Sequence, residues 1–325
     1  MRILVKGAGV AGLTVAWQLY RHGFDVTITD RADKVASGAS GLAGGMLAPW
    51  CERENAEEAV LTLGRSAADW WEAALPGQVR RNGTLVVASG RDAGELDRFA
   101  GRTSGWEWLD ADGIAALEPD LVGRFSKALF FRQEAHLDPR LALSALTAAL
   151  EEARMRFLLG ASGNTGGYER MIDCTGAARI GRLPELRGVR GEMLHLETGE
   201  IRLSRPVRLL HPRHPLYIVP REAGRFMVGA TMIESGDEGP VTARSLMELL
   251  NAAYALHPAF GEARLVETGA GVRPAYPDNL PRVTEDGDTI HVNGLYRHGF
   301  LLAPAMAGEV ARLLLQQRQP ERKAS

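Results

Sequence analysis

The first 30 residues constrain the fold of this chain more than any other segment, because they read as a strand, a glycine-rich turn, a helix and a second strand. Gly7, Gly9 and Gly12 have the spacing GxGxxG between strand and helix, and Asp30 ends the second strand. In such a turn the first glycine permits a tight bend, the second lets the backbone approach a pyrophosphate, and the third lets helix and strand pack closely. The helix N-terminus favours phosphates through its free N–H groups and partial positive charge. The pattern predicts a dinucleotide-binding βαβ unit.

Asp30 and the loop that follows it bear on which dinucleotide binds. A carboxylate at this position accepts hydrogen bonds from ribose hydroxyls and repels the 2′-phosphate of NADP. Residues 36–49 (ASGASGLAGGMLAP) are small and end in apolar residues, which lets the backbone approach a bulky planar group closely. A flexible linker is more polar than this segment. An NAD-dependent dehydrogenase is an alternative that leaves the loop unexplained.

The bulk properties are those of an ordinary globular protein. A length of 325 residues is large for one compact core, so we expect two domains. A net charge of −2 gives no reason to expect nucleic acid or an anionic membrane as partner. Cys51 and Cys174 form neither a disulfide framework nor a metal-ligand spacing. No apolar run approaches the roughly 20 residues of a membrane span, and we expect a cytoplasmic protein.

The order of the expected elements predicts an α/β fold with an insertion. Strands are expected at 83–89 and 171–176, and helices after Asp138 and Thr242 and from Pro304 onward. A βαβ start and a helical end indicate one domain built from both ends of the chain, with a strand-rich, largely antiparallel α+β domain inserted. We assign 1–82, 136–186 and 264–325 to the Rossmann-type dinucleotide-binding domain, and 83–135 and 187–263 to the inserted substrate domain.

Basic residues gather most closely between positions 202 and 213. Arg202, Arg205, Arg208 and Arg213 alternate with apolar residues, which predicts a half-exposed strand or an oligomer surface rather than a nucleic-acid site. The segment HPRH (211–214) contains two histidines, but the sequence suggests no third ligand. We therefore expect no metal.

Several segments, in their order along the chain, carry a family resemblance. They are ASGASGLAGGMLAP (36–49), RGEMLHL (190–196), YIVPR (217–221), RFMVGAT (225–231), GVRPAYPDNLPR (271–282) and GLYRHGFLLAP (294–304). Together they resemble the glycine oxidase branch of the D-amino-acid oxidase family of FAD enzymes. The match spans nearly the whole chain, and the last two segments are far more specific than the glycine spacing. The resemblance implies a Rossmann-type FAD-binding domain and an antiparallel substrate domain.

The resemblance also implies where FAD binds. Its expected contacts come from the glycine turn, the acidic strand end, the small-residue loop and the segment before the last helix. They are Gly7, Gly9, Val10, Ala11, Gly12, Asp30, Arg31, Ser37, Gly44, Gly45, Met46, Leu47, Gly176, His298, Gly299, Phe300, Leu301 and Leu302. We expect Pro304 at the first position of the last helix, whose N-terminus would stabilise negative charge on the flavin. Neither cysteine lies after position 174, in the part of the chain where some relatives attach their flavin, so non-covalent FAD is expected.

Three residues are the candidates for substrate binding. By resemblance, Arg273 grips a substrate carboxylate through a forked pair of hydrogen bonds, helped by the Tyr217 hydroxyl, and a charge-assisted bond of this kind contributes about 1.5–3 kcal/mol. Arg297 either guards the entrance or adds positive field. The alternatives are a surface ion pair for each arginine and a core position for Tyr217. His298 either changes the electrostatic environment of the flavin or is a solvated histidine.

The resemblance implies oxidation of glycine or a small N-substituted glycine by hydride transfer to FAD. Glyoxylate, ammonia or an amine, and hydrogen peroxide would be the products, and the reaction would serve synthesis of the thiamine thiazole. A small D-amino acid, sarcosine or iminodiacetate would use the same carboxylate clamp, and another acceptor than oxygen would make the enzyme a dehydrogenase. A non-catalytic flavin-binding subunit is the alternative of another class. A homo-oligomer is left open.

Two features depart from the family pattern. Residues 156–170 (RFLLGASGNTGGYER) replace a longer hairpin that ordinarily contacts adenine. Lys6 stands where the strand end is normally apolar. We expect an adenine pocket that is trimmed or partly open.

Overall fold

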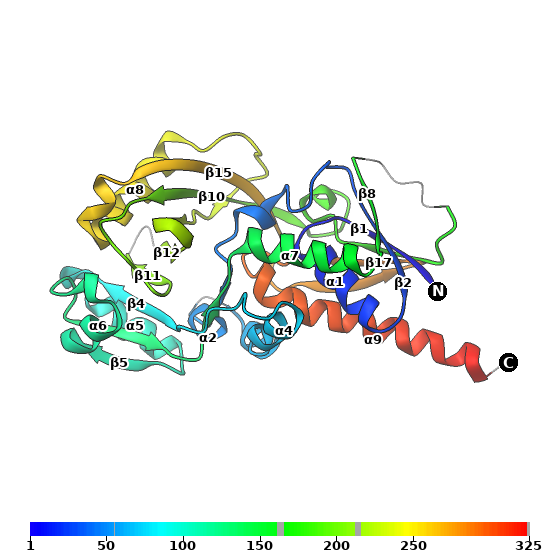
Figure 1. Cartoon of the computed structure of the whole chain (residues 1–325), viewed down its shortest axis with the longest axis horizontal. Coiled ribbons are helices and arrows are strands. Elements are labelled where there is room, and N and C mark those ends of the chain that lie inside the picture. The colour runs from blue at the N-terminus through cyan, green and yellow to red at the C-terminus, as the bar shows by residue number, and fades with distance from the viewer. Residues whose placement is uncertain (55, 161–165, 212–215, 324–325) are drawn as a thin grey trace.

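The computed structural model describes residues 1–54, 56–160, 166–211 and 216–323, and its first unit is a mainly parallel sheet. In the described chain this sheet has six strands in the order β16-β17-β9-β1-β2-β8, and only the pair β16 and β17 is antiparallel. The strands are β1 (Arg2–Lys6), β2 (Asp25–Asp30), β8 (Arg156–Leu159), β9 (Arg170–Asp173), β16 (Arg282–Asp286) and β17 (Thr289–Asn293). Three helices pack beside this sheet (Figure 1): α1 (Val10–Arg21), α7 (Pro139–Glu152) and α9 (Gly299–Lys323).

A second, larger sheet forms the other half of the molecule. Its described strands follow the order β14-β10-β13-β12-β11-β4-β6-β5, with β15 also paired to β10, and only β4 and β11 run parallel. They are β4 (Thr84–Ala88), β5 (Glu107–Asp110), β6 (Lys127–Phe131), β10 (Arg187–Glu197), β11 (Val207–Leu210), β12 (Leu216–Pro220), β13 (Arg225–Gly229), β14 (Ile233–Glu234) and β15 (Arg264–Ala275). The helices packed on it are α5 (Gly94–Arg102), α6 (Ala111–Leu117) and α8 (Ala243–Leu256).

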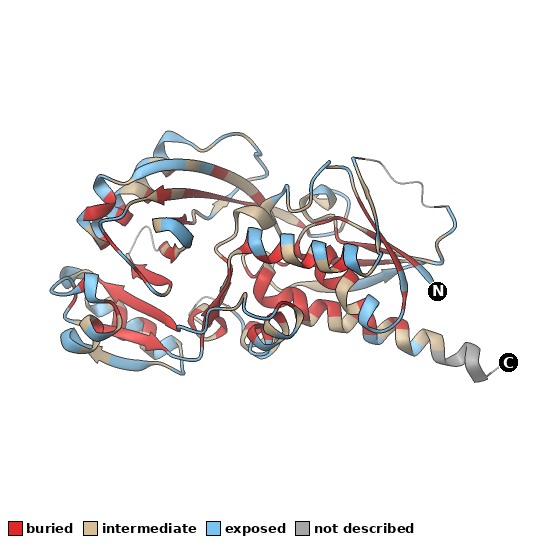
Figure 2. Ribbon diagram, viewed as in Figure 1, coloured by how far each residue is buried: buried red, intermediate tan, exposed pale blue. Residues whose placement is uncertain are grey.

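Short elements complete the chain and connect the two sheets. They are β3 (Met46–Leu47), β7 (Ala135–His136), α2 (Pro49–Glu52), α3 (Glu58–Gly64), α4 (Ala67–Ala74) and the single turns η1 (Ala39–Leu42), η2 (Gly90–Asp92), η3 (Pro119–Leu121), η4 (Gly176–Arg179), η5 (Glu222–Gly224) and η6 (Pro258–Gly261). Each sheet has its own hydrophobic core, and the buried residues concentrate on α1, α9 and the strands of the second sheet (Figure 2). Within the described ranges, every helix is too short or too polar to cross a bilayer.

The caps expected from the sequence are present at two helices. The Asp138 side chain accepts hydrogen bonds from the backbone N–H groups of Arg140 and Leu141, and Pro139 is the first residue of α7. The Thr242 side chain accepts from the N–H of Ser245 at the start of α8. Each cap satisfies backbone donors that have no partner within the helix. The α/β fold class is confirmed.

One expected boundary separates two strands that are paired in the structure. β15 pairs with β10 from Arg187↔Ala275 to Glu197↔Arg264, so β15 belongs to the second sheet although the sequence assigned 264–325 to the first domain. This strand of 12 residues ends beside η4, which follows β9 of the first sheet, and the Pro274 carbonyl accepts a hydrogen bond from the N–H of Tyr296. Arg273, near the end of β15, therefore lies between the two sheets. In the shortened segment before β9, residues 161–165 lie outside the described residues.

The prediction of a half-exposed arginine strand is wrong for β11. All four residues of β11 are buried, and Arg208 is 3% exposed. The strand lies between β4 and β12 in the middle of the sheet, and a carboxylate from α2's neighbourhood, Glu54, pairs with the buried guanidinium. Such a partner offsets the cost of removing the guanidinium from water. Arg213 and His214 lie outside the described residues.

The start of the last helix was also predicted wrongly. α9 begins at Gly299, so Pro304 lies inside the helix instead of at its first position. Proline has no N–H to donate to the carbonyl four residues earlier, which is that of Phe300. The indole Nε1 of the fully buried Trp71 donates to this carbonyl oxygen at 2.8 Å. A side chain therefore replaces the missing backbone hydrogen bond.

This replacement predicts that Trp71→Phe destabilises the protein by roughly 1–3 kcal/mol beyond its loss of volume, because the Phe300 carbonyl is left buried without a donor. Pro304→Ala restores a backbone N–H, so the same substitution should be markedly milder in the Pro304→Ala background. Urea unfolding of the four proteins measures the difference. Trp70→Phe, which removes an indole bonded to Gln18 at 3.2 Å, is the matched control. An equal effect of Trp71→Phe in both backgrounds would show that the hydrogen bond is unimportant.

Candidate active site

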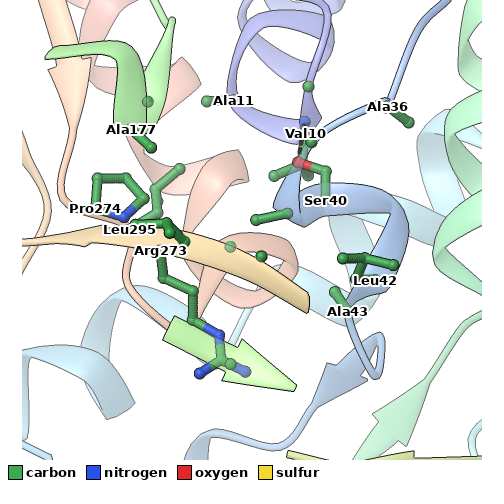
Figure 3. Close-up of a pocket in the computed structure, with 18 of the residues that line it drawn as sticks. Val10, Ala11, Ala36, Ser40, Leu42, Ala43, Ala177, Arg273, Pro274 and Leu295 are labelled. Atoms are coloured by element: carbon green, nitrogen blue, oxygen red, sulfur yellow. Dashed lines mark hydrogen bonds between the residues drawn. The ribbon is translucent and has the colours of Figure 1, made fainter. Parts of the chain in front are cut away.

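A cavity of about 1070 Å³ lies where the two sheets meet. The glycine turn before α1, the loop with η1, the ends of β10 and β15 and residues 295–301 line it. Figure 3 shows Val10 and Ser40 at one side, and Arg273 extends from β15 away from the N-terminus of α1. Ligand pockets usually measure about 300–1,000 Å³. The cavity therefore has room for a large cofactor together with a small substrate.

The glycine turn has the geometry that the sequence predicts. Gly7 adopts φ +100°, and a Cβ atom there would lie 2.5 Å from the carbonyl oxygen of Cys174. A Cβ atom at Gly12 would lie 1.8 Å from the carbonyl oxygen of Gly7, so close packing of helix on turn requires glycine. At Gly9, the nearest atom to an added Cβ is the Ser40 hydroxyl at 3.0 Å. That hydroxyl accepts a hydrogen bond from the N–H of Val10 at 3.1 Å.

Asp30, the last residue of β2, stabilises the glycine turn through hydrogen bonds. Its carboxylate accepts hydrogen bonds from the N–H groups of Ala8 at 2.6 Å and Ala32 at 2.9 Å. Each carboxylate oxygen can accept more than one hydrogen bond. Asp30 lines the cavity, so its oxygens can accept further donors there.

Most of the residues expected to contact FAD line this cavity. They are Gly7, Gly9, Val10, Ala11, Asp30, Arg31, Ser37, Gly44, Gly45, Met46, Gly176, His298, Gly299, Phe300 and Leu301. Gly12, Leu47 and Leu302 do not line it: Gly12 packs on Gly7, and the two leucines are buried in the hydrophobic core. Lys6, noted as unusual in the sequence, also lines the cavity.

The structure brings Tyr217, Arg273 and Arg297 to the same cavity from three separate segments. Arg273 donates one hydrogen bond, to the carbonyl oxygen of Thr231 at 3.1 Å. Burial and the charge of Arg297 lower the pKa of Arg273 to about 10, so the guanidinium is cationic at neutral pH. Among the described residues, no carboxylate forms a salt bridge with it. Gly191 makes room for this side chain, because a Cβ atom there would lie 2.0 Å from its Nη2 atom.

Glu52, which sequence reasoning missed, organises the other polar residues of the site. It ends α2 and accepts hydrogen bonds from the Tyr217 hydroxyl at 3.0 Å and from Nη2 of Arg297 at 3.2 Å. Nδ1 of His298 lies 3.6 Å from its other oxygen. Burial alone would raise the pKa of Glu52, but the charge of Arg297 and the other neighbours outweigh it and lower the pKa to about 2. Glu52 is therefore ionised at neutral pH.

The Tyr217 hydroxyl is fully engaged in this arrangement. It accepts a hydrogen bond from Nη1 of Arg208 at 2.7 Å and donates its proton to Glu52. Arg208 in turn pairs with Glu54. Burial raises the pKa of Tyr217 well above its usual value, so the hydroxyl keeps its proton. Donation to a substrate carboxylate, as the sequence predicts, would replace the bond to Glu52.

The sequence contained one signal for Glu52. The small-residue loop 36–49 is followed, after Trp50 and Cys51, by two carboxylates in alternate positions, Glu52 and Glu54. The second missed residue, Met232, contacts Arg297 and Tyr296 through its sulfur at 3.3 and 3.5 Å.

His298 and the cysteines have limited chemical roles in this geometry. Burial and the nearby arginines lower the pKa of His298 to about 4 against the opposing effect of Glu52, so its ring is neutral near pH 7. Cys51 and Cys174 are unpaired, and burial raises the pKa of both thiols. The described part of the chain holds no group of three side chains suited to a metal ion.

The comparisons with known proteins decide the family. A model of the FAD dependent oxidoreductase family, DAO, matches residues 2–313. The chain belongs to this family. A Rhizobium etli protein with the provisional name thiamine biosynthesis oxidoreductase ThiO is 79% identical over the full length of both chains. Crystal structures of glycine oxidase from Geobacillus kaustophilus (TM-score 0.80, 23% identity) and of iminodiacetate oxidase from Chelativorans sp. BNC1 (TM-score 0.81, 24% identity) share the fold, each over 97% of this chain and 95% of the other.

The protein is an FAD-dependent oxidoreductase, and the residues of its cavity fit that cofactor. Gly7 and Gly9 themselves place no side chain at the N-terminus of α1, which suits the close approach of a pyrophosphate. Asp30 lines the same cavity with a carboxylate that suits ribose hydroxyls, and the small-residue loop and residues 298–301 line other parts of it. The family match thus agrees with the geometry.

The depressed pKa of Glu52 predicts a pH-dependent contribution to stability. A carboxylate whose pKa falls from the ordinary 4.5 to about 2 on folding stabilises the protein above pH 4.5 and loses this effect as the pH falls toward 2. Glu52→Gln should therefore lower the free energy of unfolding by roughly 3 kcal/mol at pH 7. The difference from wild type should shrink by about 1 kcal/mol at pH 4. Urea unfolding of the FAD-loaded proteins tests this, and a difference equal at the two pH values would contradict it.

Proposed function

We propose that the protein oxidises glycine or a small N-substituted glycine, and that Arg273 anchors the substrate carboxylate. The observation that carries the proposal is a cationic guanidinium without a carboxylate partner among the described residues, in the same cavity as the predicted flavin contacts. A half-buried cation without a carboxylate partner is partly desolvated, so binding of an anion is favourable there. The planar guanidinium suits a carboxylate, since it can donate two parallel hydrogen bonds.

The remaining polar residues are proposed to shape the site around Arg273. Glu52 holds Arg297 and Tyr217 in place through the two hydrogen bonds described above. Nη1 of Arg208 donates a hydrogen bond to the Tyr217 hydroxyl and helps to fix its position. In this assignment Arg297 contributes positive field, while Arg273 binds the carboxylate directly.

When bound, FAD supplies the acceptor for a hydride from the substrate α-carbon. The chain is proposed to contribute no general base to this step. The pKa of Glu52 is about 2 and that of His298 about 4, far from the value that suits a base at neutral pH. We propose that the substrate amine releases its proton to water on binding. Glycine, oxygen and water would then give glyoxylate, ammonia and hydrogen peroxide.

The names of relatives support this substrate class and a place in thiamine synthesis. Besides the Rhizobium etli protein, a glycine oxidase from Bacillus licheniformis is 27% identical over 96% of this chain. We propose glycine as the substrate class, synthesis of the thiazole of thiamine as the role, oxygen as the acceptor and the cytoplasm as the location. A small D-amino acid is the second candidate, because Arg273 would bind its carboxylate equally.

The visible spectrum of the FAD-loaded protein, recorded without oxygen before and after adding glycine or sarcosine, tests the function. Bleaching of the flavin band within seconds to minutes supports amine oxidation. A spectrum that neither glycine, sarcosine nor a small D-amino acid changes would contradict the proposal and favour a non-catalytic flavin-binding subunit.

The assignment of the two arginines predicts unequal effects of their removal. Arg273→Met should raise the KM for glycine roughly 10- to 100-fold, because it removes charge-assisted hydrogen bonds to the carboxylate. Arg297→Met should have the smaller effect. Flavin absorbance per protein should stay unchanged in both. Steady-state peroxide assays measure the two KM values, and an unaltered KM in Arg273→Met would refute the anchor.

The room that Gly191 leaves for Arg273 predicts a further variant. Gly191→Ala places a methyl group where the guanidinium now lies, so the arginine must move and the KM for glycine should rise at least tenfold. Gly199→Ala is the control, since nothing lies within 4 Å of a Cβ atom there. Equal KM values in the two variants would show that the position of Arg273 does not set substrate binding.

A further inference from the structure

The substrate end of the cavity contains a connected set of charges that was not visible in the sequence. Arg208 pairs with Glu54 and bonds to the Tyr217 hydroxyl, which donates to Glu52, and Glu52 pairs with Arg297. Arg273 lies in the same cavity without an ion pair among the described residues. Three guanidinium groups and two carboxylates leave an excess of one positive charge, enough to balance one substrate carboxylate.

Arg297, which lies in the same cavity as Arg273, is not available to a second carboxylate. Nη2 of Arg297 binds Glu52 at 3.2 Å, and Nη1 contacts the sulfur of Met232 at 3.3 Å. The side chains of Arg297 and Glu52 are only 19% and 11% exposed. Any anion approaching Arg297 therefore meets the ionised carboxylate of Glu52 in a poorly hydrated place.

We propose that Glu52 is a specificity-determining residue that restricts the site to amines with a single carboxylate. It neutralises Arg297 and repels a second carboxylate on the substrate nitrogen, as in iminodiacetate, while N-methyl or other uncharged substituents meet no such repulsion. The inference rests on the proposed function, because it takes the anchor of the first carboxylate to be Arg273. Two like charges a few ångströms apart near a protein surface cost a factor of roughly 10 to 100 or more in binding.

The test separates charge from size by using two substrates of nearly the same shape. Iminodiacetate and its monoamide, N-(carbamoylmethyl)glycine, differ at one group that is a carboxylate in the first and a neutral amide in the second. We expect the FAD-loaded wild type to have at least a tenfold higher kcat/KM for the monoamide. In Glu52→Gln the ratio of kcat/KM for the monoamide to kcat/KM for iminodiacetate should fall at least tenfold, mainly because kcat/KM for iminodiacetate rises. Glu58→Gln removes an exposed carboxylate that pairs with Arg53, and should leave the ratio unchanged.

Binding of inhibitors gives a readout that does not depend on turnover. Acetate and malonate differ by one carboxylate, and their dissociation constants for the oxidised holoenzyme can be measured from flavin absorbance changes or thermal stabilisation. Wild type should prefer acetate, and Glu52→Gln should lose this preference. If no amine is oxidised, the proposed function fails, while the acetate and malonate constants still decide the charge selectivity.

Three results would overturn the inference. A wild-type kcat/KM for the monoamide that does not exceed that for iminodiacetate would show that the site accepts or prefers a second carboxylate. If Glu52→Gln leaves this ratio unchanged and lowers kcat/KM equally for all substrates, Glu52 acts in binding of the amino group or in maintaining the structure. Glu52→Ala provides a second charge-free variant should the glutamine protein load FAD poorly, and the same ratio in it as in wild type would equally refute the role.

Discussion

The half-buried position of Arg273 beside a large cavity, without a neutralising side chain among the described residues, is the constraint on which the rest of the site depends. Removing a cation from water is costly, and its charge-assisted partner must come from a carboxylate, either of the protein or of a ligand. The structure directs the protein carboxylates elsewhere: Glu52 to Arg297 and Glu54 to Arg208. The Thr231 carbonyl supplies one acceptor to Arg273. Of Arg208, Arg273 and Arg297, only Arg273 therefore has no carboxylate partner among the described residues.

The fold explains how this guanidinium reaches the cofactor cavity. β15 is paired with β10 along its length, and its final residues contact η4 and Tyr296, which follow β9 and β17 of the mainly parallel sheet. Glycine at position 191 on β10 gives the Arg273 side chain room to cross the strand. The glycine turn before α1 and the start of α9 approach the same cavity from the other sheet. The proposed substrate anchor and the proposed cofactor contacts thus come from different halves of the fold and line the same cavity.

Features that depend on neighbours in the sequence were predictable, and features that depend on distant partners were not. The turn at Gly7 to Gly12 and the cap at Asp138 follow from local backbone chemistry. Glu52 was missed because its partner Tyr217 is 165 positions away. The start of α9 was misplaced because Pro304 suits a helix start locally, whereas Trp71, 229 positions from Phe300, satisfies the carbonyl that proline leaves without a donor. Arg208 was read as half-exposed because alternation does not reveal that both neighbours of β11 are central strands.

The most direct measurement of the central claim is a crystal structure of the FAD-loaded protein with glycolate, which has the carboxylate of glycine but no amine to oxidise. The account predicts that both carboxylate oxygens of glycolate lie within hydrogen-bonding distance of the Arg273 guanidinium, while Arg297 remains paired with Glu52. A carboxylate bound to Arg297, with Glu52 displaced and Arg273 unoccupied, would contradict it.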